Sequence, residues 1–179
     1  ILQEGGIKVY RQDFNDDPGK VWFDNDKEGR TGIAENKYVQ GYLTYWDNLL
    51  ENVPGLWIDT CASGGGRMDL ETLRRSVPLH RTDALIEADS YITTQTISQS
   101  LFNWIPFNGD QANDSAASVV TKYGIRSAFA PSINMNFNPY AATTDFKLMK
   151  GLCEEWEIIK DFYYADYYEL TGWTRDKDS

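Results

Sequence analysis

Short apolar runs alternate with longer amphipathic stretches along this chain, and the alternation predicts its elements. Ile7–Tyr10 and Leu56–Thr60 have the length and composition of strands. Between them, Glu35–Val53 carries apolar residues at helical spacing, and Pro54-Gly55 ends the predicted helix. The residues before this helix, Asn15–Gly32, are rich in Asp, Gly and Pro and predict a loop. The first part of the chain therefore predicts one strand–helix–strand unit.

The same alternation continues toward the carboxyl end and predicts an α/β fold. The further predicted elements are, in order, a helix at Asp69–Arg75, a strand at Val77–His80, a helix at Ala88–Leu101, a strand at Asn103–Phe107, a helix at Ala116–Lys122, a strand within Ser127–Asn136 and a helix at Thr143–Tyr168. Strands that alternate with helices pair in parallel through right-handed crossovers. No glycine-rich dinucleotide fingerprint follows the first strand. We therefore favour the back half of a (β/α)8 TIM barrel, from about its fourth strand to its eighth, over an open doubly wound sheet.

Composition and charge narrow the class of protein. We expect residues 1–179 to form a single domain. The chain carries 17 basic and 27 acidic residues, a net charge of −10, which argues against nucleic acid or an anionic membrane as a partner. No apolar run approaches the ~20 residues of a membrane helix. Because it starts at Ile1 and ends in a polar tail, we expect a piece of a longer protein, which leaves the compartment open, with a slight preference for the cytoplasm.

A glycine-rich stretch and two aspartates carry the candidate chemistry. Three consecutive glycines lie within Cys61–Asp69, directly after a predicted strand. Glycine brings bare backbone close to another group because it has no Cβ. Asp13 and Asp83 lie just beyond the ends of two other strand-like segments. This layout is typical of a sugar-cleaving site on an α/β barrel, where one carboxylate is the nucleophile and the other the general acid/base.

Neighbouring residues distinguish the two aspartates. Arg11 lies two residues before Asp13 on the same side of the strand, and a guanidinium there favours the ionised carboxylate that a nucleophile needs. Asp83 is followed by the apolar residues 84–86, surroundings that favour a protonated acid. Arg81, two residues before Asp83, argues the other way. The alternative interpretation is that both aspartates are helix caps or loop carboxylates.

The remaining polar residues indicate no metal and no cofactor. Asp24–Glu35 imitates a calcium loop, but no helix is predicted before it, and we expect a solvated loop. His80 is the only histidine, which excludes a histidine-rich metal site and favours a hydrogen-bonded structural role. Cys61 has no obvious base beside it and is expected to be a contact residue. Cys153 lies on a predicted helix, so a disulfide framework is not indicated.

Three motifs resemble those of glycoside hydrolase family 36, the melibiase-type α-galactosidases. The family's K-W-D-x-N motif corresponds to Arg11–Asn15, and its C-x-x-G-G-G-R-x-D motif is intact at Cys61–Asp69. The family's W-x-S-D motif corresponds to the last four residues of Leu79–Asp83. The order and spacing of the motifs agree along most of the chain. The resemblance starts at the fourth strand of the family's barrel and stops where its C-terminal β-domain would begin.

The resemblance implies retaining hydrolysis of terminal α-galactosides, of the melibiose and raffinose type, by double displacement. Asp13 would be the nucleophile and Asp83 the general acid/base. The earlier strands of such a barrel would supply further sugar-binding residues. We therefore expect the chain alone to be inactive, or to associate with a second copy or with the missing barrel half.

The resemblance also implies substrate-binding residues. Arg11 stands where the family has a lysine that contacts the sugar hydroxyls, although the planar fork of arginine is not equivalent to an ammonium group. Asn15 is the last residue of the same motif. Cys61 and Gly64 would line the pocket beside the 2-hydroxyl group, where a small surface favours galactose over its N-acetylated relative.

Besides Arg11, the chain departs from the family at three motif positions. Gln12 and His80 each stand in place of a tryptophan, and Thr82 stands in place of a serine. These departures bear on galactose specificity more than on the type of reaction. Asp69 also matches a family position. We interpret it, with Arg67, as support for the glycine loop, and it is the alternative candidate for the acid/base.

Three other function classes compete with the α-galactosidase hypothesis. A transglycosylase or an α-N-acetylgalactosaminidase would use the same fold. A non-catalytic carbohydrate-binding or scaffold fragment would explain the altered motifs as lost chemistry. A phosphate-binding domain could use Gly64–Gly66 and the following helix, but the lysine and hydroxyl residue of a P-loop are missing.

Overall fold

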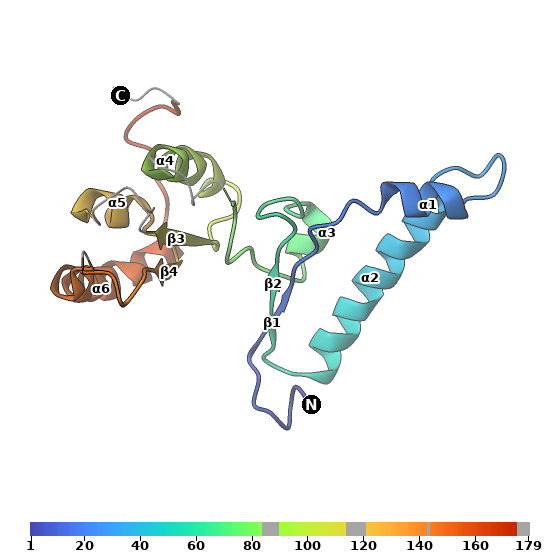
Figure 1. The fold of residues 1–179 in the computed structure, drawn as a ribbon, viewed down its shortest axis with the longest axis horizontal. Helices are drawn as coiled ribbons and strands as arrows, with labels where there is room; N and C mark the ends of the chain where they lie inside the picture. The colour runs from blue at the N-terminus through green and yellow to red at the C-terminus, as the bar shows by residue number, and fades with distance from the viewer. Residues whose placement is uncertain (84–89, 114–120, 143, 175–179) are drawn as a thin grey trace. The chain divides into compact units, whose positions relative to one another are not determined.

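The protein has an α/β fold with parallel strands, as predicted. The structure, a computed structural model, describes residues 1–83, 90–113, 121–142 and 144–174. The chain divides into two compact units, unit 1 (Ile1–Val77) and unit 2 (Pro78–Ser179). Among the residues that the structure describes, each unit contains one pair of parallel strands with helices against it (Figure 1).

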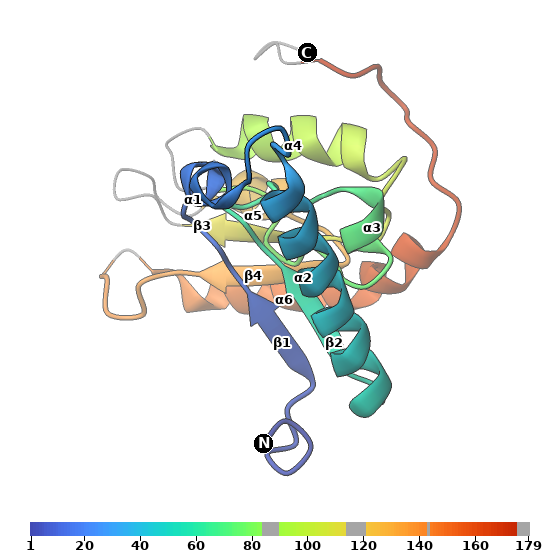
Figure 2. The same ribbon diagram turned by 90° about the vertical axis from the view of Figure 1, so that its right-hand side faces the viewer.

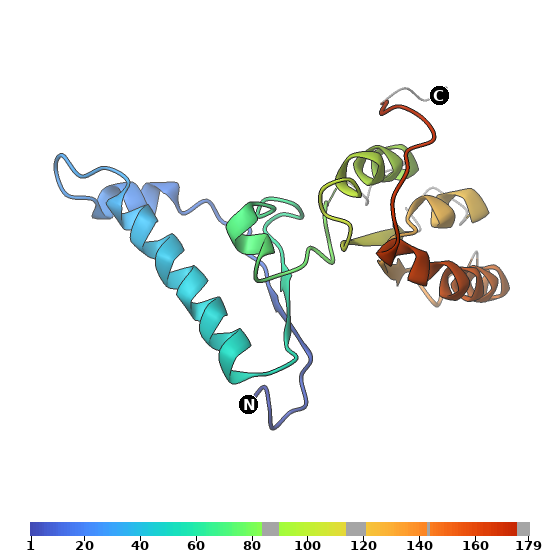
Figure 3. The ribbon, with the colours of Figure 1, turned by 180° about the vertical axis from the view of Figure 1, so that it is seen from behind.

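Unit 1 combines a parallel strand pair with a long helix. Its elements are, in order, β1 (Val9–Gln12), α1 (Gly19–Asn25), α2 (Ile33–Asn52), β2 (Trp57–Thr60) and α3 (Leu70–Leu73). The views from front and back show β1 and β2 side by side, with α2 along one side of the pair (Figures 1 and 3). The predicted strand–helix–strand unit is confirmed.

The loop predicted over Asn15–Gly32 is wrong in part, because it contains α1. Lys20 and Asp24 form an ion pair one turn apart, with 2.5 Å between nitrogen and oxygen. Trp22 packs against Tyr38 of α2, with ring centroids 5.2 Å apart. Contact with a distant segment therefore stabilises a short helix that local composition does not indicate.

The residues that imitate a calcium loop cap a helix. The carboxylate of Asp26 accepts hydrogen bonds from the N–H groups of Ala34, at 2.7 Å, and Gly32, at 2.5 Å. These two bonds lower the pKa of the Asp26 carboxyl group. Gly32 adopts a φ of 91°, which favours glycine, and α2 begins at the next residue.

One face of the β1–β2 pair is covered by α2. Trp46 is fully buried, and its indole N–H donates to Gln12 Oε1 at 2.6 Å. The ring of Tyr45 lies edge-on to that of Tyr10, with centroids 6.2 Å apart. Because side chains alternate along a strand, Tyr10 and Gln12 point to the covered face and Arg11 points to the opposite one.

The strand predicted at Val77–His80 is reduced to a single bridge. Val77 pairs in parallel with Asp59. The N–H of Val77 donates to the carbonyl of Ile58 at 2.8 Å, and the N–H of Thr60 donates to the carbonyl of Val77 at 3.0 Å. The next residue is Pro78, which has no N–H to continue the ladder.

Unit 2 combines a second parallel pair with three α-helices among its described residues. Its elements are, in order, α4 (Ser90–Leu101), β3 (Gly109–Asn113), α5 (Lys122–Ser127), β4 (Ser132–Asn136), α6 (Phe146–Ile159) and a 3-10 helix, η2 (Lys160–Tyr164). Figure 2 shows β3 and β4 side by side. The strand predicted within Ser127–Asn136 is confirmed.

β3 lies later in the chain than the strand predicted at Asn103–Phe107. The apolar stretch Asn103–Phe107 suggested a strand, but Trp104 is 85% exposed and the strand runs from Gly109 to Asn113. The strand contains Asp110, a fully buried carboxylate. The hydrophobic pattern missed it because a polar residue is buried here through an ion pair rather than by apolar character.

The helix predicted at Ala116–Lys122 falls largely outside the described residues. α5 begins at Lys122, where the preceding residue, Thr121, accepts a hydrogen bond from the N–H of Gly124 at 3.0 Å. Thr121 is therefore the N-cap that fixes the start of this short helix.

The final helix begins close to the predicted position and ends earlier. Asp145 caps α6 by accepting from the N–H of Leu148 at 2.9 Å. The prediction of helix to Tyr168 is wrong, because α6 ends at Ile159 and only the short η2 follows. Beyond η2 the chain accepts hydrogen bonds from the side chains of Thr96 and Gln99 in α4, and from Asn103 just after this helix. These contacts hold the segment away from a continued helix.

The core of unit 2 lies between its strands and two of its helices. It comprises Ala112, Ile125, Ala128, Phe129 and Leu152, with partly buried residues of β4 and α6 packed against it. Within the described residues no helix is both long and apolar enough to cross a membrane.

Candidate active site

The carboxyl ends of β1 and β2 meet at one edge of unit 1. The parallel register pairs Arg11 with Asp59, and beyond the strands the N–H of Cys61 donates to the carbonyl of Gln12 at 3.0 Å. Asp13 and Cys61 therefore leave the two strands next to each other. Alternation places both on the face that α2 does not cover.

A guanidinium group links two carboxylates on this face. Arg11 Nη1 donates to Asp59 Oδ2 at 2.5 Å, and Arg11 Nη2 lies 3.7 Å from Asp13 Oδ2. The Asp59 side chain is 7% exposed, whereas those of Arg11 and Asp13 are 39% and 37% exposed. Burial alone would lower the pKa of Arg11, but the hydrogen bond and charge of Asp59 outweigh it and raise that pKa. The site thus holds a fixed cation beside a carboxylate that solvent reaches.

Asp59 is a site residue that the sequence motifs do not single out. It lies inside a predicted strand, where a single polar residue within an apolar run does not indicate a functional role. The available signal was alternation, since Asp59 and Cys61 are two residues apart and share a face. The register that places Asp59 opposite Arg11 comes only from the tertiary structure.

The thiol of Cys61 connects Asp13 to the glycine loop. Cys61 is 1% exposed, and burial raises the pKa of its thiol. The N–H of Gly64 and the charge of Arg11 oppose that rise, whereas a hydrogen bond with Asp13 adds to it. A buried thiol in these surroundings stays protonated, which suits a contact residue better than a nucleophile.

Asn15 holds the glycine loop in place. Its Oδ1 accepts hydrogen bonds from the backbone N–H and the hydroxyl of Ser63, at 3.1 and 3.2 Å. Ser63 and Gly64 both adopt positive φ, 47° and 75°. At Gly66 a Cβ atom would lie 2.5 Å from the carbonyl oxygen of Ala62, so only glycine fits. The predicted residues Asp13, Asn15, Cys61 and Gly64 are thereby brought together at one strand edge.

Arg67 and Asp69 support this loop. The Arg67 guanidinium lies 4.8 Å from the ring centroid of Phe14 and 4.9 Å from that of Tyr42. Asp69 Oδ1 accepts from two backbone N–H groups in the first turn of α3, at 2.9 and 3.0 Å. Asp69 is thus the N-cap of α3, in keeping with its expected structural role.

The second candidate carboxylate belongs to unit 2. His80 Nε2 lies 2.8 Å from Asp83 Oδ1, and the two side chains are 15% and 53% exposed. His80 thus has the hydrogen-bonded role expected for it. The apolar surroundings predicted for Asp83 rest on residues 84–86, which lie outside the described residues.

The arginine two residues before Asp83 is committed to a different carboxylate. Arg81 forms an ion pair with Asp110, and both side chains are fully buried. Arg81 also donates to Asn108 Oδ1 at 2.7 Å and to Ser98 Oγ at 2.9 Å. Burial raises the pKa of Asp110 to about 6, although the charge of Arg81 opposes this. The positive charge of Arg81 is therefore paired with the carboxylate of Asp110.

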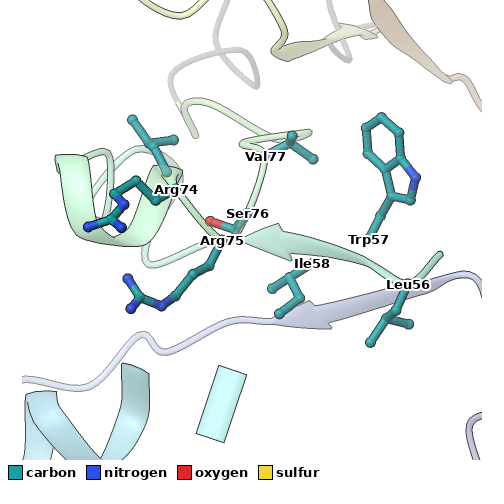
Figure 4. Close-up of a pocket in the computed structure, with 8 residues that line it drawn as sticks. Leu56, Trp57, Ile58, Arg74, Arg75, Ser76 and Val77 are labelled. Carbon is teal, nitrogen blue, oxygen red and sulfur yellow. The ribbon is translucent and has the colours of Figure 1, made fainter. Parts of the chain in front are cut away.

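A groove at the amino end of β2 has a different character. It has a volume of about 250 Å³ and is lined by Leu56–Ile58 and Leu73–Val77 (Figure 4). Trp57 and Ile58 point to opposite sides of the strand there. The lining contains no carboxylate, and the candidate residues lie at the other end of the strands.

Comparison with solved structures supplies a fold relationship. The galactosidase domain of the α-galactosidase–sucrose kinase AgaSK matches 95% of this chain with a TM-score of 0.68 and 18% identity. The α-galactosidase from Lactobacillus brevis matches 92% with a TM-score of 0.69 and 15% identity. In fold, this chain resembles part of an α-galactosidase. The chain spans only 23% of the length of each of these two proteins.

Sequence comparison adds no further relationship. No model of a protein family matches the chain, and no curated protein matches it significantly. The α-galactosidase-like fold therefore rests on three-dimensional similarity, at identities too low to transfer an activity.

Proposed function

We propose that this chain is the carboxyl-terminal part of the catalytic barrel of a retaining glycoside hydrolase of family 36. It would contribute about strands four to eight of a (β/α)8 barrel and cleave terminal α-galactosides. The observation that carries the proposal is the placement of Asp13 at a parallel strand end, beside Arg11 and the buried Cys61, in a fold like that of α-galactosidases. Catalytic groups of such barrels lie at the carboxyl ends of the strands.

The reaction would proceed in two displacements. Asp13 attacks the anomeric carbon while Asp83 donates its proton to the departing glycosidic oxygen, and a covalent galactosyl–enzyme forms. Asp83, now a carboxylate, then takes a proton from water as the water attacks the same carbon. Asp13 is released unchanged, and two inversions retain the anomeric configuration.

The residues around Asp13 would bind the sugar. The solvent-reachable part of the Arg11 guanidinium can donate to hydroxyl groups, and Asn15 Nδ2 lies at the same edge while its Oδ1 holds the loop. Cys61 and Gly64 would form the small surface beside the 2-hydroxyl group, which has no room for an N-acetyl group.

The open face of the unit 1 sheet supports an incomplete barrel. Val9 and Trp57 form a register pair on the face opposite α2, and they are 47% and 46% exposed. In a closed barrel this face would point inward and be packed by side chains of other strands. We therefore propose that activity needs the rest of the barrel, in the same polypeptide or in a second copy.

Nucleophile replacement tests this function. In the complete polypeptide that carries this chain, Asp13→Gly should lower hydrolysis of aryl α-galactosides by ~10⁴-fold or more. Added azide should restore turnover and give a β-galactosyl azide, because one displacement then replaces two. The 179-residue chain by itself should remain inactive. Undiminished hydrolysis by Asp13→Gly would refute the assignment, and sugar binding without turnover by the wild type would indicate a binding module.

A further inference from the structure

Arg11 stands at a position where the family motif that this segment resembles has a lysine. The substitution changes how the positive charge is presented to its neighbours. A lysine ammonium is a compact point charge, whereas a guanidinium presents its donors as a rigid planar fork. In this chain the fork has two carboxylate neighbours, with Nη1 on Asp59 at 2.5 Å and Nη2 at 3.7 Å from Asp13.

The two contacts are unequal in burial and in length. Asp59 is buried and takes the short contact, while Asp13 is exposed to solvent and takes the long one. A buried carboxylate needs a partner, so the Asp59 contact fixes the guanidinium. The second nitrogen then keeps its direction toward Asp13, because the fork is planar and cannot turn one arm alone.

Strand register makes this arrangement rigid. Arg11 and Asp59 are direct partners in the parallel pair, and Asp59 is held on its other side by the bridge to Val77. Asp59 therefore lies on an inner strand position, where its backbone is paired on both sides.

We propose that Asp59 is a positioning residue, a buried carboxylate that orients the Arg11 guanidinium toward the candidate nucleophile Asp13. This inference rests on the proposed function. Asp59 acts through Arg11 and does not touch the sugar. The arginine at this position and the carboxylate opposite it work as a pair, so neither is expected to function with the other removed.

Chemical rescue separates this role from a structural one. In the complete polypeptide, Asp59→Asn should lower kcat/KM for an aryl α-galactoside by ~10- to 100-fold, and Asp59→Glu should recover part of the loss. Arg11→Ala should lose a similar factor. Millimolar guanidinium chloride should restore activity to Arg11→Ala, since the free ion can bind to the Asp59 carboxylate in place of the missing side chain. Potassium chloride at equal ionic strength should not.

The decisive comparison is the double variant Arg11→Ala/Asp59→Asn. It should show no rescue by guanidinium, and Asp59→Asn should cost little further activity in this background. Asp47→Asn, which removes the ion pair of Arg75 in the same unit, is the matched control and should retain wild-type turnover. Equal rescue with and without Asp59, or wild-type turnover by Asp59→Asn, would overturn the proposal.

The positioning role can be judged even if the function proposal fails. A wild-type polypeptide without turnover of any aryl galactoside would refute the proposed function. A crystal structure of Asp59→Asn then decides the inference independently. An Arg11 guanidinium displaced from Asp13 would support the positioning role, and an unchanged one would overturn it.

Discussion

Unit 1 and unit 2 each place an arginine two residues before a candidate catalytic aspartate. The two arginines differ in how much solvent reaches them and in which carboxylate they contact. In unit 1, Arg11 and Asp13 are 39% and 37% exposed. In unit 2, Arg81 and its partner Asp110 are fully buried, while Asp83 lies outside that pair and is 53% exposed. The arginine of unit 1 is therefore available to a ligand, and that of unit 2 is not.

The difference in burial gives the two ion pairs different effects on stability. A buried ion pair fixes the segment that carries it, because breaking the pair leaves an uncompensated charge. A solvent-exposed pair such as Arg11–Asp13 contributes little to stability. Arg81–Asp110 thus holds the chain before Asp83, whereas Arg11 lies in the candidate site, where solvent reaches it.

After loss of the nucleophile Asp13, removal of the Asp83 carboxyl should have the largest effect on the proposed reaction. We expect Asp83→Asn to lower turnover of α-galactosides with poor leaving groups by ~10²- to 10⁴-fold, because these need protonation of the departing oxygen. Aryl galactosides with acidic phenols should lose much less. Asp161→Asn, an exposed aspartate of the same unit, is the control. Equal losses for both leaving groups would contradict the acid role, as measured by initial rates on the complete polypeptide.

Removal of one member of the buried pair should have the largest effect on stability. Arg81→Met leaves the Asp110 carboxylate unpaired and should destabilise unit 2 by about 3–5 kcal/mol. Hydrogen exchange of β3 and β4 amides would measure this, with β1 and β2 as the internal reference. The double variant Arg81→Met/Asp110→Leu should recover much of the loss. Unchanged exchange in Arg81→Met would show that the pair does not hold unit 2.

The raised pKa of Asp110 predicts a pH dependence for unit 2. Burial shifts this pKa from 3.8 to about 6, against the opposing charges of Arg81 and His80. The folded state therefore binds the Asp110 proton more tightly than the unfolded chain does. Stability from this group is present below the unfolded value and falls as the pH rises toward 6, by up to ~3 kcal/mol.

Urea unfolding between pH 4 and 7, followed through the NMR signals of β3 and β4, measures this slope. Asp110→Asn should remove that part of the slope while leaving the pH dependence of the β1 and β2 signals unchanged. The same slope in Asp110→Asn and in the wild type would show that another group causes it.

Substitution of Asp69 should have the smallest effect on stability. It distinguishes the role of Asp69 as a helix N-cap from the alternative role as the acid/base. As the N-cap of α3, Asp69→Ala should cost about 1 kcal/mol of stability, whereas Asp69→Asn, an equally good cap, should cost almost nothing. Both variants should keep their activity. Loss of turnover in a fully stable Asp69→Asn would instead make Asp69 the acid/base and displace Asp83.

Local pattern was sufficient for β1, α2 and β2 of unit 1 and for the glycine loop. Apolar spacing predicted α2 and both strands, since one buried face imposes a period on the sequence. The cluster of Asp13, Cys61 and Gly64 followed from parallel strands, whose carboxyl ends meet at one edge. The loop chemistry followed from the glycines, because Gly66 admits no Cβ.

Tertiary structure alone decided where polar residues are buried. The strand at Gly109–Asn113 escaped prediction because Asp110 is buried through Arg81, a residue 29 positions away. α1 escaped it because Trp22 packs on a later helix, and Asp59 because strand register sets it against Arg11. Hydrophobic periodicity records which residues avoid water, but it does not record which charges meet. The sequence by itself thus determined most of the α/β elements and the candidate carboxylates, while long-range pairing determined which carboxylates are buried beside an arginine and which one caps a helix.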